Sequence, residues 1–297
     1  MKKTYYRISI LVILLILLIL YLLNANLIIE NTLSYTTLFI EKLFPASFIF
    51  FTFSSLLIDY GFIEFITTTF HLNGSKIYLT IMSLISGFPS GAKYTKELLE
   101  KKLITPKEAN YYITYTHFPN PLFILGTVNK IIQNTKYTLL LLLSILLGNF
   151  ITSIIYKTKT TNLIITPLPT TKDFSSSLSN AIISSLKTII IIYGTSLFFY
   201  LISTIINHYL ILTTYPYIIL NGLFDLTKGV TSTTLITNNI HKALLIIIFI
   251  SLGGLSIHMQ VKSILTDTKI NYKNFFHGRI ISTIIAILFF LSFINLL

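Results

Sequence analysis

Long apolar segments separated by short polar ones fill almost the whole chain. A helix needs about 20 mostly apolar residues to cross the hydrocarbon core of a bilayer. The pattern predicts helices at 8–29, 43–58, 75–92, 111–130, 137–156, 178–206, 208–223, 240–261 and 279–297. We therefore expect an all-α polytopic membrane protein with about eight or nine transmembrane or re-entrant helices.

Three stretches qualify this pattern. Residues 43–58 and 61–73 are too short for two full spans, which favours a re-entrant hairpin. The segment 178–206 is overlong, so we expect it to be tilted, broken or partly interfacial. In the polar loop that precedes 111–130, Thr105 is followed by Pro106 and then by Glu108, which predicts a helix start with a capping box.

Composition places the chain in the membrane. Of its 297 residues, 53% are hydrophobic and only 11% are charged, whereas soluble domains have roughly 25% charged residues. The charged residues behind the net charge of +12 lie between the apolar runs, where signals for membrane orientation are found. We therefore expect a lipid bilayer, and no nucleic acid, as partner. The whole chain, 1–297, is predicted to form a single integral membrane domain, and the pattern leaves open whether it forms a homo-oligomer.

Lysines predict the orientation of this domain. Cytoplasmic loops of membrane proteins carry an excess of Lys and Arg. The loop 93–110 holds the densest cluster, namely Lys93, Lys96, Lys101, Lys102 and Lys107. We expect this loop and the N-terminus to face the cytoplasm, with 8–29 an uncleaved transmembrane helix because no small-x-small cleavage pattern follows it.

The chain divides into two halves, 30–156 and 178–297, joined by a polar linker at 157–177. Residues 61–65 can be aligned with 222–226, and residues 86–88 with 253–255, at nearly the same offset. Apolar sequences also match by chance. Two landmarks in the same order nevertheless favour two inverted repeats with broken helices, a common transporter design.

Two polar interruptions, 86–93 and 253–260, lie within apolar stretches. Unwound backbone at membrane depth is tolerated only where protein buries it or a water-filled cavity receives it, and paired interruptions point to a transporter's binding site. We predict that they lie close together near the bilayer midplane and that Lys93 and His258 neutralise a dianionic substrate. The predicted substrate-binding residues are Ser86, Gly87, Pro89, Ser90, Gly91, Lys93, Asn120, Pro121, Gly253, Gly254, Ser256, His258 and Gln260.

Each of these features also has a purely structural interpretation. Small residues line many helix–helix contacts in membranes, His258 can be a packed, hydrogen-bonded residue, and Asn120-Pro121 can be a simple kink. Among the acidic residues, Glu64 and Asp225 are the best candidates for binding a coupling ion because the repeat alignment pairs them, although charges at an interface remain the simpler interpretation.

The sequence gives no sign of an enzyme, a metal site or a cofactor. It has no Cys, its six His are scattered, and it has neither a phosphate-binding Gly-x-x-x-x-Gly-Lys-Ser/Thr motif nor a His-Glu-x-x-His motif. Ser90 within Gly-Phe-Pro-Ser-Gly lacks the strand–turn–helix context of a nucleophile elbow. We expect a membrane protein that performs no covalent chemistry.

Several motifs resemble those of a known family. The signature Leu84–Lys93 is followed by 103–109, by Asn-Pro-Leu-Phe-Ile at 120–124, and by Gly253–Val261 with Ser-Ile-Leu at 263–265 and Asp-Thr at 267–268. In this order and spacing they resemble the sporulation integral membrane proteins of the YlbJ/SpoVV type, which carry the nucleoside recognition (Gate) domain. The resemblance runs from about Leu43 to Arg279; Asn221-Gly222 matches only in part.

This resemblance implies a spore-forming bacterium and movement of dipicolinate across the outer forespore membrane. The substrate expected is thus a small, flat, anionic aromatic compound. Two departures from the family pattern, the short loops and Thr116–Pro119 before Asn120, leave the substrate open. The alternatives are a non-transporting membrane protein of sporulation assemblies and a nucleoside-type permease.

Overall fold

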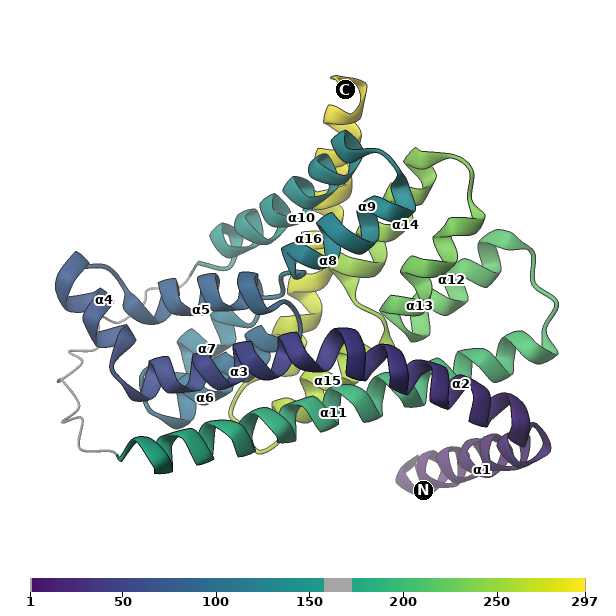
Figure 1. The fold of residues 1–297 in the computed structure, drawn as a ribbon, viewed down its shortest axis with the longest axis horizontal. Coiled ribbons are helices and arrows are strands. Elements are labelled where there is room, and N and C mark those ends of the chain that lie inside the picture. Colours follow the sequence, from purple (N-terminus) through teal and green to yellow (C-terminus); the bar gives the residue numbers. More distant parts are fainter. Residues whose placement is uncertain (1, 158–172, 297) are drawn as a thin grey trace.

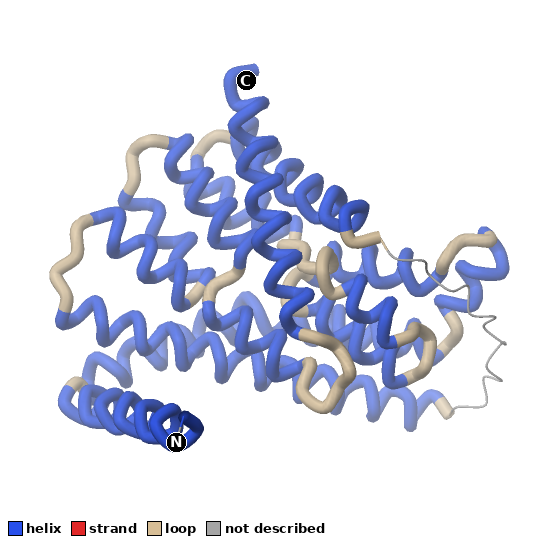
Figure 2. The backbone as a smooth tube through the Cα atoms, turned by 180° about the vertical axis from the view of Figure 1, so that it is seen from behind, coloured by secondary structure: helices blue, strands red, loops and turns tan. Residues whose placement is uncertain are grey.

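The computed structural model describes residues 2–157 and 173–296, and this part of the chain is helical with no strand. Most of the predicted linker, 158–172, lies outside the described residues, as do Lys159 and Lys172 within it. Figures 1 and 2 show a layered bundle in which two long rods lie along one side. The fold class predicted from the apolar pattern is confirmed.

Each rod is formed by the first residues of one half of the chain. The first rod joins α2 (Ala25–Leu38), a π turn (Phe39–Leu43) and α3 (Phe44–Asp59), and the second is α11 (Phe174–Tyr209). They pack along each other, chiefly through α3 (Figure 1). The segment predicted at 178–206 is therefore one unbroken helix, longer than expected, and not a broken one.

The N-terminal segment differs from its prediction. Helix α1 (Lys2–Leu23) ends before Asn24, and α2 begins at Ala25, so no single helix covers 8–29. The Asn24 side chain donates to the Leu20 carbonyl at 2.8 Å and to the Tyr209 hydroxyl at 2.8 Å. An amide that bonds to its own turn and to another helix stabilises a bend there, which explains the interruption.

The rest of the first half consists of shorter helices. They are α4 (Phe62–Phe70), α5 (Gly74–Ser86), α6 (Ser90–Glu100), α7 (Pro106–Tyr112), α8 (Pro121–Phe123), a π turn (Ile124–Val128), α9 (Asn129–Ile132) and α10 (Thr135–Ile155). Helices α3 and α4 are bent by 60° at Gly61, a geometry that fits a broken span or a re-entrant loop. The capping box predicted at Thr105 and Glu108 is confirmed.

The second half follows a similar order after α11. Its elements are α12 (Thr214–Phe224), α13 (Leu226–Ser232), a 3-10 turn (Thr233–Leu235), α14 (Asn239–Leu252), α15 (Leu255–Ile264), α16 (Tyr272–Phe293) and a final 3-10 turn (Ile294–Leu296). The last long helices of the halves, α10 and α16, pack side by side, as α3 and α11 do. This arrangement suits two related halves, although the repeat itself stays a prediction.

Five described helices are long and apolar enough to cross a membrane, or six if the bent pair α3–α4 counts as one span. Their bounds are Thr4–Leu23, Thr135–Ile155, Phe174–Tyr209, Asn239–Ile264 and Tyr272–Phe293. The predictions at 137–156, 240–261 and 279–297 agree with this set, whereas the count of eight or nine is not confirmed. The protein is thus an all-α integral membrane protein.

Three predicted spans are wrong as continuous helices. Within 75–92, α5 ends at Ser86, and within 208–223, α11 ends at Tyr209 and the 11-residue α12 begins at Thr214. Within 111–130, α7 ends at Tyr112 and α8 begins only at Pro121. Proline has no backbone N–H and clashes with the preceding turn, so Pro119 and Pro121 oppose a helix there.

Candidate functional site

The two polar interruptions are breaks between helices, with glycine at each break. Gly87 ends α5 with φ +77°, and Gly253 ends α14 with φ +77°. Residues with a Cβ rarely adopt this left-handed region, so glycine is required for the turn. The matching φ angles indicate that Gly87 corresponds to Gly253. The sequence alignment instead pairs Gly87 with the next residue, Gly254.

The breaks differ in shape. Helix α6 turns back and packs against α5, whereas α14 and α15 together form one 26-residue apolar stretch interrupted at Gly253 (Figure 1). The first break therefore makes a helical hairpin, and the second only unwinds a span.

The first break packs against the unwound segment between α7 and α8. A Cβ on Gly87 would lie 2.8 Å from Asn120, and one on Gly91 would overlap the Thr116 carbonyl. Asn120 caps α8 by accepting from the Leu122 N–H at 2.8 Å, and the Ser90 hydroxyl donates to the Gly87 carbonyl. These predicted site residues form one junction, which we call the α5–α6 junction.

The second break packs against the turn between α12 and α13, forming a junction that we call the α14–α15 junction. A Cβ on Gly254 would lie 2.8 Å from the Gly222 carbonyl. Asp225, buried in this turn, caps α13 by accepting from the Lys228 N–H at 3.0 Å, and Ser256 lies beside it. Asp225 therefore serves as the N-cap of α13.

Arg279 connects the two junctions from α16, and its side chain is completely buried. Its guanidinium donates to the carbonyls of Thr114 (2.7 Å), His117 (3.3 Å) and Ser251 (3.5 Å) and to Asn149 Oδ1 (2.9 Å). Phe88 stacks on the His117 ring at 5.0 Å between centroids. Arginine thus replaces the hydrogen bonds that the unwound backbone of 113–120 lacks.

The roles of Arg279 and Asn149 were not predicted from the sequence. Arg279 directly precedes the apolar run that begins at Ile280, and a cation at the edge of such a run is more typical of an interface than of a buried hydrogen-bonding site. Asn149 donates to the His117 carbonyl at 3.0 Å, which gives the unwound segment a second anchor.

His258 and Gln260 bind other parts of the protein. His258 Nδ1 is 2.6 Å from the Tyr272 hydroxyl, and its Nε2 is 3.0 Å from the Leu252 carbonyl. Both ring nitrogens of His258 therefore have partners. Gln260 donates to Ser196 Oγ at 2.8 Å, which joins α15 to α11, while its Oε1 has no partner.

Lys93 is the predicted site residue that lines a cavity. This cavity, of about 470 Å³, lies between α6, α11 and α15. It is lined by Lys93, Lys96, Glu97, Glu100, Asn180, Ile183, Ser184, Lys187, Thr188, Ile191, Ser263 and Ile264. We call it the α6–α11–α15 cavity. His258 does not line this cavity.

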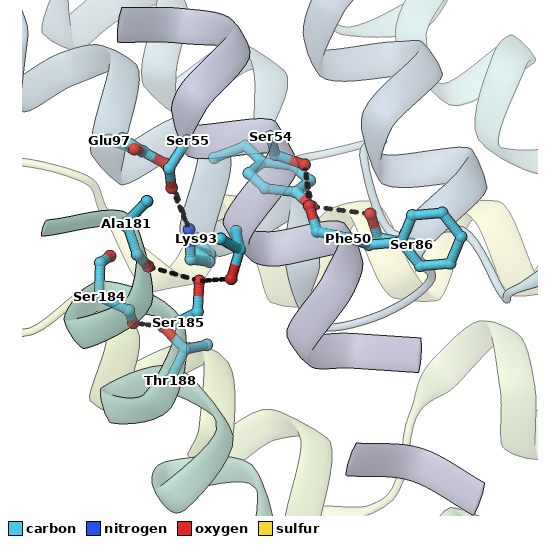
Figure 3. Close-up of polar contacts among 12 residues, drawn as sticks. Phe50, Ser54, Ser55, Ser86, Lys93, Glu97, Ala181, Ser184, Ser185 and Thr188 are labelled. Atoms are coloured by element: carbon cyan, nitrogen blue, oxygen red, sulfur yellow. Dashed lines mark hydrogen bonds and ion pairs between the residues drawn. The ribbon is translucent and has the colours of Figure 1, made fainter. Parts of the chain in front are cut away.

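The Lys93 ammonium is buried and held by several groups. It donates to Ser55 Oγ at 3.1 Å and pairs with Glu97 Oε2 at 3.3 Å (Figure 3). The centroid of the Phe51 ring lies 5.4 Å away. Glu97 also pairs with Lys101 at 3.4 Å. Glu97 therefore serves two ammonium groups, and because Lys101 also pairs with Asp59 at 2.8 Å, the network balances two positive charges against two negative ones.

Beside Lys93, the hydroxyl of Tyr94 joins two serines in a separate chain of hydrogen bonds. Tyr94 OH accepts from Ser54 Oγ at 2.8 Å and lies 2.7 Å from Ser86 Oγ (Figure 3). Ser86 thereby joins α5 to α3 and α6, and it does not line the α6–α11–α15 cavity.

Glu64 is unusual among the described acidic residues. It is buried in α4, 7% exposed, and neither carboxylate oxygen has a hydrogen-bond partner. A buried carboxylate costs free energy unless a proton, a cation or hydrogen bonds compensate for lost water. Within the described chain, no group of three or more His, Cys, Asp or Glu could hold a metal ion.

The fold and its broken helices define a polytopic integral membrane protein with polar groups at helix breaks. The chain is 25% identical, over 84% of its length and 73% of the relative's, to the sporulation integral membrane protein YlbJ of Bacillus subtilis (strain 168). This similarity supports a relationship to YlbJ-like proteins. No protein-family model and no solved structure matches the chain, so the SpoVV and Gate-domain parts of the expectation are not confirmed.

Proposed function

We propose that this protein acts in spore formation as a membrane transporter or facilitator for a small anionic aromatic compound, with dipicolinate as the substrate expected. The role in sporulation rests on the similarity to YlbJ, and the outer forespore membrane is the location that the family resemblance implies. Transport is favoured by the pair of helix breaks, because discontinuous helices form the binding sites of many transporters.

The α6–α11–α15 cavity is the observation that carries the proposal. Its volume of about 470 Å³ lies in the range of about 300–1,000 Å³ that is typical of small-molecule sites. Its lining has three lysines and two glutamates, a formal charge of 3 − 2 = +1. Serine, threonine and asparagine side chains from α11 and α15 add hydrogen-bonding groups. This chemistry suits an organic anion.

Lys93 and Lys187 face this cavity from opposite elements. Lys93 is tied to Glu97 in α6, whereas Lys187 projects from α11 with its side chain exposed. We expect Lys187 to bind a carboxylate directly and Lys93 to present its ammonium to the cavity from α6. Of the predicted binding residues, those in the two junctions would then shape the helices around the substrate and not touch it.

Glu64 is the better of the two coupling-ion candidates. Its carboxylate is buried without a partner, whereas Asp225 is already used as a helix cap. A carboxylate in this environment suits a group that binds and releases a proton or a cation during each transport cycle.

One alternative has support of its own. Three predicted binding residues already form hydrogen bonds within the protein, namely His258, Ser86 and Asn120. This is expected of a non-transporting assembly protein of the spore membrane. A nucleoside-type permease has no comparable support, because a neutral nucleoside gains little from three lysines.

A thermal-stability panel separates these candidates. A ligand that binds only the folded state adds about 2.7 kcal/mol at 100 times its Kd. We expect dipicolinate, and not uridine, to raise the melting temperature of the purified protein. Lys187→Met should weaken this effect at least tenfold, since a charge-assisted hydrogen bond contributes about 1.5–3 kcal/mol. Lys262→Met is the control, because Lys262 is exposed on α15 and does not line the cavity.

A shift for uridine alone would favour the permease, and no shift for either compound would favour the assembly protein. A dipicolinate shift that Lys187→Met and Lys262→Met reduce equally would exclude the cavity as the site.

A further inference from the structure

The ammonium of Lys228 lies in a cage of neutral oxygens. From α13, it donates to Thr204 Oγ1 at 2.6 Å, to Ser203 Oγ at 2.9 Å and to the Tyr200 carbonyl at 3.4 Å, all on α11. It also lies 4.4 Å from the centroid of the Tyr200 ring. Three oxygens and an aromatic face thus converge on one positive charge.

The hydroxyl groups of the cage are oriented for a cation. Ser203 and Thr204 both donate their hydroxyl protons to the Tyr200 carbonyl, at 2.8 and 2.9 Å. A hydroxyl has one proton to donate and two lone pairs that accept. With the protons used within α11, the lone pairs of both hydroxyls face the position of the ammonium. Ser203 is completely buried, and Thr204 nearly so.

The cage holds its charge without an ion pair. Within the described chain, no carboxylate oxygen lies within 4 Å of the Lys228 ammonium, and the nearby Asp225 uses Oδ1 to accept the Lys228 backbone N–H. Lys93, by contrast, depends on Glu97. Oxygen atoms are the ligands that hard cations prefer, and the carbonyl and two hydroxyls of this cage are all oxygen ligands.

We propose that the Lys228 ammonium occupies a monovalent-cation site formed by the Tyr200 carbonyl, Ser203 Oγ and Thr204 Oγ1, so that the native protein supplies its own cation there and binds no Na⁺ at this position. The three N–H donors of an ammonium match the three oxygens in number. The inference does not depend on which substrate the protein moves, because it concerns the cage alone.

Removing the ammonium tests this assignment. Lys228→Ala leaves the oxygens and opens space among them. We expect the purified variant to bind at least tenfold more ²²Na⁺ than the native protein and to melt at a higher temperature in NaCl than in choline chloride. The native protein should show neither effect.

Lys242→Ala is the matched control. Lys242 is also a buried lysine, but its ammonium donates to a single carbonyl, that of Ile131, at 3.1 Å. Its removal leaves no cage, so ²²Na⁺ binding should stay at the native level. In the Lys228→Ala background, Ser203→Ala should lower the gained binding at least tenfold because it removes one of the three oxygens.

A folded Lys228→Ala variant that binds no more ²²Na⁺ than Lys242→Ala would overturn the proposal. If Lys228→Ala does not fold, Lys228→Ser, which adds an oxygen, is tested in the same way. Failure of both variants to fold in NaCl as well as in choline chloride would also overturn it, since a free cation could not then replace the ammonium.

Discussion

Arg279 donates from Nη2 to the Thr114 carbonyl at 2.7 Å, so a side chain of α16 bonds the backbone of a segment 165 positions earlier in the chain. The same guanidinium reaches the carbonyls of His117 and Ser251. One buried cation therefore connects the unwound segment 113–120 of the first half with the end of α14 in the second.

Removing this cation should destabilise the protein strongly. In Arg279→Ala, the buried carbonyls of Thr114 and His117 lose a donor, and each buried group left without its partner costs about 1–3 kcal/mol. We expect Arg279→Ala to unfold or aggregate in detergent. Arg279→Lys keeps a charge but not the planar set of donors. Its melting temperature should therefore lie between those of the native protein and Arg279→Ala. A native melting temperature for Arg279→Ala would contradict this role.

The left-handed turn at the first break should not tolerate a side chain. Gly87→Ala would place a Cβ 2.8 Å from Asn120 on a backbone with φ +77°. We expect it to lower the free energy of unfolding by about 1–3 kcal/mol, the range for a strained backbone position. Gly194→Ala is the control: Gly194 lies in α11 with nothing within 4 Å of an added Cβ, so the change should be neutral or stabilising by up to about 1 kcal/mol. Equal melting temperatures for the two variants would refute the steric argument.

The orientation predicted from the lysines can be tested with one cysteine, because the native chain has none. Lys107 is the suitable position: it is exposed at the start of α7, whereas Lys101 is tied to Asp59 at 2.8 Å. We expect Lys107→Cys to react with a membrane-impermeant maleimide only after the cells are opened. Labelling from outside intact cells would reverse the topology.

Glu64 should matter for coupling more than for folding. Glu64→Gln keeps the size of the side chain and removes its charge, and the native carboxylate has no protein partner to lose. We therefore expect an unchanged or higher melting temperature, because a buried unpaired charge is costly, together with loss of the dependence of uptake on an imposed proton or cation gradient. Gradient-dependent uptake equal to that of the native protein would remove Glu64 as the coupling group.

The sequence alone predicted features that depend on neighbouring residues. The apolar runs predicted an all-helical membrane protein, and the polar interruptions predicted helix breaks, because Gly87, Pro89 and Gly253 disfavour helix locally. The capping box at Thr105 followed from the same kind of local rule.

Features that depend on distant partners could not be predicted in this way. Pro119 disfavours a helix through the residues before it, but no local signal indicates that Arg279 and Asn149 donate to the carbonyls of the unwound segment. Likewise, nothing near His258 in the sequence indicates that Tyr272 and the Leu252 carbonyl satisfy both of its ring nitrogens.

The central claim, transport of a small aromatic dianion through a site that includes Lys93, is tested most directly by uptake of labelled dipicolinate into proteoliposomes. The native protein should accumulate dipicolinate above protein-free liposomes and should not take up uridine. Lys93→Met should reduce uptake at least tenfold while the protein stays folded, because Glu97 keeps Lys101 as its partner, and Lys262→Met should have no effect. Absence of dipicolinate uptake by the native protein, or equal uptake by Lys93→Met, would contradict the claim.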